Sequence, residues 1–378
     1  MTTWIFNYRR YRLPFRTRVR TAHGEWRERE GLIVRLEDAA GVAAYGEAAT
    51  MPWFGTETVD EAEAACRAFG ASVDETQIGA VPPKLACLRN ALAAAVVAHF
   101  DLKVDAGSSP RPEAAGTPLL RWQTFEAKCV TTAGGAGSSE RWSGLSLTRS
   151  IGVAALLPAG RAALAAAIPK AEAGFRVFKW KVGVGDFEEE MGLFDELCAA
   201  VPEGSKFRLD ANGAWDRRRA ERWLSRCAER PVEWVEQPIS PTARGADDLL
   251  LGLATDYPTP VALDESLVAE GDVDRWLGTG WPGVYVVKPA LLGDADGVLA
   301  RLAKAKASVC FSSAFETGIG ARTSLRAAFD WPGESRALGF GVWPLFEDAR
   351  FNGPSATPFL RWADVERINP EAIWTALS

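Results

Sequence analysis

The second half of the sequence repeats a short apolar run that ends in a charged or polar residue and is followed by a helix-like segment. Eight such runs lie between residues 152 and 344, and they read GVAALLP, FRVFKWKVG, KFRLDANG, VEWVEQP, VALDES, VYVVKPA, SVCFSSAFET and ALGFGVWP. From Lys181 to Ser312 the polar run ends recur every 24 to 29 residues, which is about the length of one βα unit. The repeat therefore predicts an α/β fold, with a parallel (β/α) barrel favoured over an open sheet.

An open, doubly wound sheet is the alternative arrangement for this repeat. In that fold a glycine-rich phosphate-binding turn is expected after the first strand. The candidate segment, GVGDFEEE at residues 183–190, lacks the third glycine of the dinucleotide fingerprint. The barrel is thus the better prediction.

The first third of the chain has a different pattern. Residues 4–50 alternate apolar and polar side chains and contain the turn sequence DAAG, which predicts antiparallel strands. Residues 58–106 have the pattern of helices. Strands followed by helices indicate a small α+β domain. Residues 126–144 are rich in glycine and serine, so we expect a linker or surface loop there.

Composition narrows the classes of function. The formal net charge is −6 and no basic stripe is present, so nucleic acid is not an expected partner. The most apolar stretch is interrupted by Pro158, Gly160 and Arg161, too early for membrane insertion. The start of the sequence lacks the apolar core of a signal peptide. The six cysteines are scattered without a CxxC pair, which is typical of reduced thiols in a cytoplasm.

Charged residues stand at the ends of five successive runs: Lys179 and Lys181, Asp210, Glu236, Asp264 with Glu265, and Lys288. Active sites of parallel barrels lie at the C-terminal ends of the strands. Carboxylates converging there from three strands would repel one another unless a cation lay between them. The chain has two histidines, His23 and His99, both in its first third. An oxygen-only ligand set predicts a hard ion such as Mg²⁺.

The two lysines of the run FRVFKWKVG point to a base. Side chains alternate along a strand, so Lys179 and Lys181 should both face the barrel mouth while Trp180 faces the helices. Near a cation and partly desolvated, a lysine has a lowered pKa and can act as a base near neutral pH. One such residue alone is more often a helix cap or a solvated side chain. The whole set is better explained by catalysis, because interior charges are costly.

The order K-x-K, D-A-N, E-Q-P, D-E-S, K-P resembles the enolase superfamily, in its muconate-cycloisomerase-like subgroup. The resemblance implies an enolase-type (β/α)7β TIM-like barrel with an N-terminal α+β capping domain. It divides the chain into a cap at residues 1–125, the linker at 126–144, the barrel at 145–342, and a C-terminal segment at 343–378 that returns to the cap. A mandelate-racemase-like subgroup would use a histidine on a later strand, and none follows residue 99.

Further stretches resemble the o-succinylbenzoate synthase family: RLPFRTRVRTAHG, REGLIVRL, AALLPAG, FSSAFETGIG and ALGFGVWPLF. This resemblance implies a lyase of menaquinone or phylloquinone biosynthesis that dehydrates 2-succinyl-6-hydroxy-2,4-cyclohexadiene-1-carboxylate, a small-molecule carboxylate. Lys181 would be the base. Lys288 would stabilise the enediolate from the other face, and Lys179 would lower the pKa of Lys181. The implied Mg²⁺ ligands, with Mn²⁺ as a substitute, are Asp210, Glu236 and Asp264, and the implied groups that orient them are Asn212 and Glu265.

Several candidates remain open between two roles. Ser312 and Ser313 could bind a substrate carboxylate or be strand hydroxyls satisfied by the backbone. Glu316 could orient the site or belong to the cap of the next helix. Two cap loops, at residues 21–24 and 51–55, should cover the site and bring His23, Trp53 and Phe54 to the substrate. His23 could equally be a turn residue, and His99 is expected in the interior without chemistry.

Competing functions share parts of this set. N-succinylamino acid racemases and muconate cycloisomerases would use the same metal and lysines. Dipeptide epimerases are disfavoured, because they resemble one another in a D-x-D pair on the eighth strand, which reads ALGFGVWP here. A Schiff-base aldolase would need only one buried lysine and would leave the carboxylates unexplained. The oligomeric state is left open by the sequence.

Overall fold

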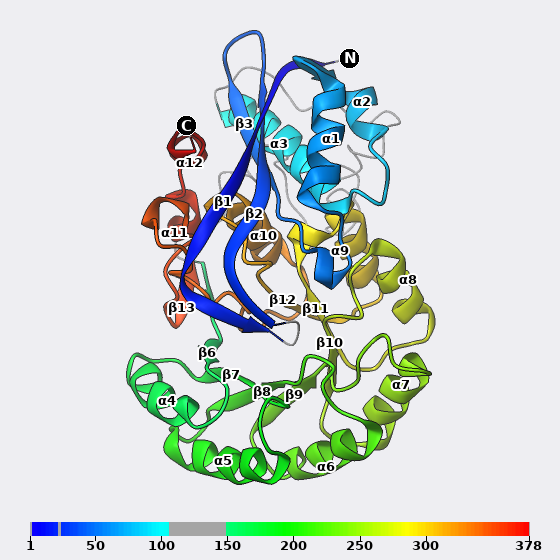
Figure 1. Cartoon of the computed structure of the whole chain (residues 1–378), viewed down its shortest axis with the longest axis vertical. Coiled ribbons are helices and arrows are strands. Elements are labelled where there is room, and N and C mark those ends of the chain that lie inside the picture. Colours follow the sequence, from blue (N-terminus) through cyan, green and yellow to red (C-terminus); the bar gives the residue numbers. More distant parts are fainter. Residues whose placement is uncertain (1, 22–23, 106–148, 378) are drawn as a thin grey trace, which may run out of the picture.

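The computed structural model describes residues 2–21, 24–105 and 149–377. His23 and the expected linker at 126–144 lie outside these ranges. Figure 1 shows two layers of organisation, with an antiparallel sheet and its helices above the open end of a ring of strands and helices.

The N-terminal sheet has four strands in the order β3-β2-β1-β4. They are β1 (Thr3–Thr21), β2 (Gly24–Glu37), β3 (Ala43–Ala48) and β4 (Ser72–Asp74). Apolar residues at every second position explain why β2 forms a strand, since Leu32, Val34 and Leu36 are buried in the core of this domain. The Asp38 carboxylate accepts hydrogen bonds from the backbone of Ala40 and Val42, which fixes the turn from β2 to β3.

Helices cover one face of this sheet. They are α1 (Val59–Phe69), α2 (Glu75–Gly79) and α3 (Ala86–Asp105), with the short η1 (Pro52–Phe54) before them. A capping box between Thr58 and Glu61 starts α1. Strand β3 and helix α3 touch at Gly46, where a Cβ atom would lie 1.8 Å from the Ala91 carbonyl oxygen. The sequence pattern predicted the strands and the long helices but not β4 or α2, which are too short to show a period.

The C-terminal part contains a seven-stranded sheet in the order β12-β11-β10-β9-β8-β7-β6, with every pair parallel. The strands are β6 (Ala155–Leu157), β7 (Val177–Lys181), β8 (Lys206–Asp210), β9 (Val232–Glu236), β10 (Val261–Leu263), β11 (Val284–Val287) and β12 (Ser308–Phe311). The helices are α4 (Ala162–Glu172), α5 (Phe187–Ala200), α6 (Arg217–Cys227), α7 (Ala246–Asp256), α8 (Glu270–Gly278), α9 (Ala295–Lys304) and α10 (Gly318–Asp330). Figure 1 shows them outside the strands.

The eighth expected run closes the ring by isolated bridges. Leu338 pairs with Val153, and Gly339 pairs with Ser312 at the end of β12. The run therefore lies between the first and last strands of the sheet, as a (β/α)7β barrel requires. The backbones approach closely here, because a Cβ at Gly341 would lie 2.3 Å from the Ala154 carbonyl oxygen.

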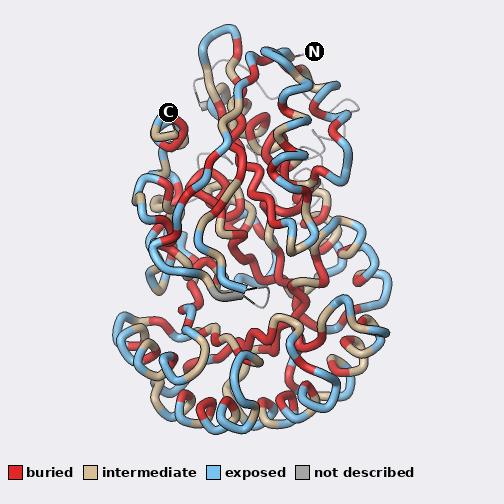
Figure 2. The backbone as a smooth tube through the Cα atoms, in the orientation of Figure 1, coloured by how far each residue is buried: buried red, intermediate tan, exposed pale blue. Residues whose placement is uncertain are grey.

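Most residues of the barrel strands are buried (Figure 2). Outside, Trp180 of β7 is completely buried and packs against Phe194 and Trp223 of the helices. Inside, Trp234, Ala262, Val284, Val286 and Cys310 form a separate apolar cluster. This inner cluster forms an apolar floor below the charged strand ends.

The C-terminal elements return to the N-terminal sheet. They comprise η4 (Ala349–Phe351), β13 (Phe359–Arg361), α11 (Trp362–Glu366) and α12 (Pro370–Ala376), and β13 pairs with β5 (Ser150–Gly152). Trp374 of α12 packs against Tyr45, and the Arg9 guanidinium lies 4.3 Å from the centroid of the Trp374 ring. In the described ranges, no helix is long and apolar enough to cross a membrane.

Candidate active site

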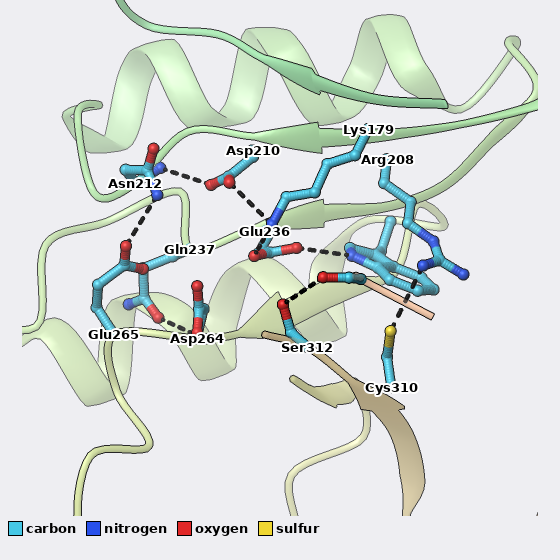
Figure 3. A network of polar contacts seen from close by, with 12 residues as sticks. Lys179, Arg208, Asp210, Asn212, Glu236, Gln237, Asp264, Glu265, Cys310 and Ser312 are labelled. Carbon is cyan, nitrogen blue, oxygen red and sulfur yellow. Dashed lines mark hydrogen bonds and ion pairs between the residues drawn. The ribbon is translucent and has the colours of Figure 1, made fainter. Parts of the chain in front are cut away.

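The charged strand ends lie side by side because the strands are in register. Lys181 of β7 pairs with Asp210 of β8, and Asp210 pairs with Glu236 of β9. Lys179 lies one layer lower, paired with Arg208. Figure 3 shows the side chains of Lys179, Asp210 and Glu236 converging from three successive strands.

Lys179 bridges two of the carboxylates. Its Nζ atom lies 2.9 Å from Asp210 Oδ2 and 2.6 Å from Glu236 Oε1. Burial acts to lower the pKa of Lys179, but the two carboxylates together outweigh it and raise this pKa above its usual value. Burial alone would raise the pKa of Asp210, but the charges of Lys179 and Lys181 outweigh burial and lower this pKa. Lys179 is therefore held as an ammonium group at the centre of the site.

Lys181 experiences the opposite balance. Burial lowers the pKa of Lys181, the Lys179 ammonium lowers it further, and the Asp210 carboxylate only partly compensates. A lowered pKa increases the fraction of Lys181 present as the free amine, which is the form that accepts a proton.

The third carboxylate, Asp264, follows β10 and is paired with Lys288 at the end of β11. Burial, followed by the charge of Lys179, lowers the pKa of Lys288. The Lys288 ammonium also lies 4.5 Å from the centroid of the Phe54 ring, within the range of a cation–π contact. Lys288 and Lys181 thus approach the mouth from strands β11 and β7, four places apart in the sheet order.

Asn212 and Glu265 form an outer pair beside these groups. The Asn212 amide donates to Glu265 Oε1 at 2.9 Å, and its backbone N–H donates to Asp210 Oδ1 at 3.2 Å (Figure 3). Burial and the negative charge of Asp210 raise the pKa of Glu265 to about 7. Asn212 Oδ1 and Glu265 Oε2 are buried acceptors without a hydrogen-bond partner in the described part of the chain. Such orphaned oxygens indicate a place for a further positive or donating group.

The carboxylates were expected to meet in one cluster, and here the structure differs. Within the described ranges, no three His, Cys, Asp or Glu side chains lie close enough to hold a metal ion. Lysine ammonium groups lie against the carboxylates instead, because attraction between opposite charges is strong in a buried site. The donor set still suits a hard divalent cation. Oxygen ligands from Asp210, Glu236 and Asp264 are all buried, and two orphaned oxygens lie beside them.

Gln237 is a site residue that the sequence analysis did not single out. Its side chain is fully buried, accepts from the backbone N–H of Asp264 at 3.0 Å, and donates to Ser266 Oγ at 2.8 Å. It has a φ of 38°, a conformation that non-glycine residues adopt only when surrounding contacts hold it. Gln237 fixes the backbone around Asp264 to the end of β9. Its position next to Glu236 in the motif E-Q-P was the available signal.

The serines after β12 have local partners. Ser312 Oγ donates to the Gly339 carbonyl at 3.4 Å, on the eighth run. Ser313 Oγ donates to Glu316 Oε2 at 2.7 Å and accepts from the Phe315 N–H at 2.9 Å. Glu316 also accepts from the Ala314 N–H at 2.6 Å. The geometry thus agrees with the structural alternative for Ser313 and places Glu316 in the turn before α10.

Aromatic side chains of the cap pack against the segment that follows β12. The rings of Trp53 and Trp26 are 4.2 Å apart between centroids, and Trp26 also packs against Phe315. Leu156 of β6 pairs with Lys179 and is 41% exposed. Because paired neighbours face the same side of a sheet, Leu156 gives the mouth an apolar wall. In the sequence, Leu156 is one of several apolar residues of the run GVAALLP, and nothing there marks it as exposed.

Two further residues, Arg208 and His99, lie outside the mouth. Arg208 stacks on Trp234, with its guanidinium 4.0 Å from the ring centroid, and pairs with Glu233 at 2.6 Å. His99 is fully buried in α3, receives a hydrogen bond from Trp4 and contacts Asp38. Burial lowers the pKa of His99. Both residues have structural partners, as expected for His99.

Comparisons with known proteins agree with this architecture. A family model described as "Enolase C-terminal domain-like" matches residues 161–357, and one described as "MenC, N-terminal domain" matches residues 5–86. An o-succinylbenzoate synthase from Thermosynechococcus vestitus (strain NIES-2133 / IAM M-273 / BP-1) is 35% identical over 342 residues, 89% of this chain and 92% of that protein.

Solved structures agree as well. The crystal structure of o-succinylbenzoate synthase from Thermosynechococcus elongatus BP-1, complexed with Mg in the active site, matches with a TM-score of 0.72 and 33% identity over 94% of this chain and 96% of that one. A dipeptide epimerase from Enterococcus faecalis V583 has a TM-score of 0.73 at 22% identity, over 96% and 97% of the two chains, and shares the fold.

The fold and the order of the strand-end residues define a member of the enolase superfamily, to which this chain belongs. Within it, the matched N-terminal domain and the long alignment place the chain in the o-succinylbenzoate synthase family.

Proposed function

We propose that the protein is an o-succinylbenzoate synthase, which dehydrates 2-succinyl-6-hydroxy-2,4-cyclohexadiene-1-carboxylate to 2-succinylbenzoate. The observation that carries the proposal is the placement of two half-buried lysines, Lys181 and Lys288, on separate strands around the carboxylates of Asp210 and Glu236. This arrangement suits removal of a proton next to a carboxylate. The match of residues 5–86 to the MenC N-terminal domain favours this reaction over those of other members of the superfamily.

The residues proposed to hold Mg²⁺ are Asp210, Glu236 and Asp264, at the ends of consecutive strands. When bound, the ion would supply positive charge beside the substrate carboxylate. Asn212 and Glu265 would orient this ligand set through their hydrogen bond. The lysines that contact these carboxylates would then release them to the cation and face the substrate.

Lys181 would take the proton from the ring carbon that bears the carboxylate. The C–H electron pair moves toward that carboxylate and gives an enediolate. The hydroxide on the neighbouring ring carbon then leaves and takes the proton from Lys181, so the products are one water and an aromatic ring. The lowered pKa of Lys181 favours the first proton transfer, and the gain of aromaticity drives the second step.

Lys288 and Lys179 would act through charge and position. Lys288 approaches from β11, on a different side of the mouth from Lys181, where its ammonium can lie against the planar enediolate. Lys179 supplies the positive charge that lowers the pKa of Lys181. Trp53 and Phe54 of the cap would exclude water from the substrate, and Leu156 would contact its ring.

The division of the chain and its surroundings are part of the proposal. The two matched family models, at residues 5–86 and 161–357, support a cap and a barrel as separate units. The cysteines that the structure describes are free thiols, which supports a reducing cytoplasm. The substrate is a small-molecule carboxylate, and no role for nucleic acid is proposed.

A spectrophotometric dehydration assay on the cyclohexadiene carboxylate tests this function. We expect turnover with Mg²⁺, loss of turnover in EDTA, and a fall in kcat of at least about 100-fold in Lys181→Ala, because the proton then has no base. Lys206→Ala is the matched control, since Lys206 is an exposed lysine at the opposite end of the neighbouring strand β8.

Each alternative outcome has a distinct meaning. Turnover that persists in EDTA would contradict the metal assignment and favour a Schiff-base lysine. A wild-type protein that is inactive in the dehydration assay would contradict the proposal that it is a synthase.

Racemisation of N-succinylamino acids is a second candidate, favoured by the placement of Lys181 and Lys288 on strands far apart in the sheet order. Two bases on different sides of one carbon can exchange its proton in either configuration. Incorporation of deuterium from D₂O into N-succinylamino acids of both configurations is the expected sign of this activity, and its absence would contradict it.

A further inference from the structure

Two buried side chains of the cap hold the same short segment of the barrel. We call this segment the β12–α10 turn, residues 312–317, which follows strand β12 and leads into helix α10. It begins with Ser312, at the level of the site, and includes Phe315, whose ring packs against Trp26 of the cap. The two cap residues are Glu47 of β3 and Arg29 of β2.

Glu47, a residue of the cap, accepts hydrogen bonds from the backbone N–H groups at the N-terminus of α10. Its carboxylate accepts from the Thr317 N–H at 2.9 and 3.0 Å, from the Gly320 N–H at 2.9 Å, and from the Thr317 hydroxyl. Tyr11 donates to the same carboxylate at 2.6 Å. The first N–H groups of a helix have no partner within the helix and favour an anion. Here that anion comes from a residue 270 positions away in the sequence.

The packing leaves Glu47 little freedom. The neighbouring Gly46 lies directly against helix α3, where a Cβ would overlap the Ala91 carbonyl. On the barrel side, a Cβ at Gly320 would lie 3.0 Å from Glu47 Oε2 and 2.8 Å from Glu316 Cβ. Glu47 itself is 2% exposed. The Glu47 carboxylate is thus held between a close backbone contact within the cap and the glycine surface of α10.

Arg29 holds the other side of the turn. Its guanidinium donates to the carbonyl oxygens of Phe315 at 3.2 Å and Ala314 at 3.4 Å, and also to that of Thr50. Thr50 immediately precedes the cap loop at residues 51–55, which carries Phe54. One planar cation therefore joins the cap loop to the β12–α10 turn.

The turn requires such support because its backbone is strained. Phe315 has a φ of 58°, in the left-handed region that residues other than glycine rarely adopt. A residue in this conformation persists only when neighbouring contacts determine it. The contacts here are the Arg29 bonds to the Phe315 carbonyl and the Ser313 bond to its N–H.

We propose that Glu47 and Arg29 are positioning residues that seat the cap on the barrel and thereby set the β12–α10 turn at the active-site mouth. This inference rests on the proposed dehydration, since the turn is placed beside the substrate of that reaction. Neither residue touches the reacting atoms. They act through the positions of Ser312 and Phe315 and through the cap loop that precedes Phe54.

Hydrogen–deuterium exchange on the full chain tests the contact without using activity. In Glu47→Gln the side-chain amide turns a donor toward the N–H groups of Thr317 and Gly320. We expect amides of residues 312–320 to exchange at least about tenfold faster than in the wild type. Asp101→Asn is the control, because Asp101 joins the cap helix α3 to Arg326 on the same helix α10, away from its N-terminus. It should leave residues 312–320 unchanged.

Kinetics with the cyclohexadiene carboxylate test the consequence for the reaction. We expect kcat/KM to fall at least about tenfold in Glu47→Gln and to stay near the wild-type value in Asp101→Asn. Arg29→Lys is the second variant, and it remains informative if Glu47→Gln does not fold. It keeps the charge but loses the planar group that reaches the carbonyls of Phe315, Thr50 and Ala314. We expect the same faster exchange and the same fall in kcat/KM.

The outcomes separate the proposals. Unchanged exchange at residues 312–320 overturns the positioning role, whatever the activity. Faster exchange with unchanged kcat/KM in an active enzyme overturns it too, because the turn then does not matter for the reaction. If the wild type is inactive, the proposed function fails, and the exchange experiment alone decides whether these residues hold the turn.

Discussion

Lys179 and Lys181 lie two residues apart on one strand, yet their surroundings move their pKa values in opposite directions. Lys179 contacts two carboxylates, and its pKa is raised; burial beside the charge of Lys179 lowers the pKa of Lys181. The spacing K-x-K was enough to predict that both face the mouth. The spacing alone could not show which of the two lysines is the base. The pKa of each lysine depends on its distances to carboxylates on neighbouring strands, which the sequence does not give.

Glu316 is a single residue for which the structure predicts a pH dependence of stability. It is fully buried, and burial, increased by the charge of Glu47, raises its pKa from 4.5 to about 7. A raised pKa in the folded state contributes stability that is complete below the unfolded value and is lost as the pH rises through about 7. The wild type should therefore lose about 3 kcal/mol of unfolding free energy through this group between pH 4.5 and 8.

Glu316→Gln should remove this part of the pH dependence. The glutamine carbonyl can still accept from Ser313 and Ala314, and the group no longer ionises. Urea unfolding at pH 5, 6, 7 and 8 measures the effect. Glu203→Gln, at an exposed loop position, is the control. Parallel pH profiles for Glu316→Gln and the wild type would contradict the shifted pKa.

At the scale of elements, the contact between β3 and α3 determines where Glu47 lies. Gly46 allows the backbone of β3 to approach Ala91 of the helix more closely than any side chain permits. The sequence AAYGEA predicted a strand, but it carried no sign of this contact, since an isolated glycine in a strand can also mark a bulge. The contact partner is a backbone carbonyl, which no side-chain pattern reveals.

Gly46→Ala should destabilise the protein by more than about 3 kcal/mol or prevent folding, because the new Cβ would overlap backbone atoms that cannot rotate away. Gly252→Ala is the matched control. Gly252 lies within helix α7 with nothing within 4 Å of its Cβ position, so alanine there should stabilise by about 0.5–1 kcal/mol. Thermal unfolding of both variants measures the difference, and equal effects would contradict the close approach.

At the scale of the whole molecule, the placement of three carboxylates at successive strand ends was predictable. The contacts that lysines make with these carboxylates were not. The repeat of charged strand ends predicted the barrel and placed Asp210, Glu236 and Asp264 at the ends of consecutive strands. Supports such as Gln237, Leu156 and the cap residues Arg29 and Glu47 were not anticipated. Their importance comes from partners far away in the sequence, and a one-dimensional pattern does not contain those distances.

Added Mg²⁺ should stabilise the whole protein, because a ligand that binds only the folded state raises the free energy of unfolding. At 100 times the dissociation constant the gain is about 2.7 kcal/mol, seen as a higher melting temperature. Glu236→Gln should lose most of this gain, whereas Glu196→Gln, on the outer helix α5, should keep it. A Mg²⁺ effect of equal size in all three proteins would contradict the proposed ligand set.

The contact between Glu47 and the start of α10 also has a kinetic consequence. It joins residues 270 apart in the sequence, and closing so long a loop has a larger entropic cost than forming a single βα unit. The barrel strands and their helices can assemble from near neighbours, while the contact that seats the cap must wait for both halves of the chain. We therefore expect the mouth of this enzyme to be among the last parts to form during folding, so that a nearly native molecule is still without a finished site.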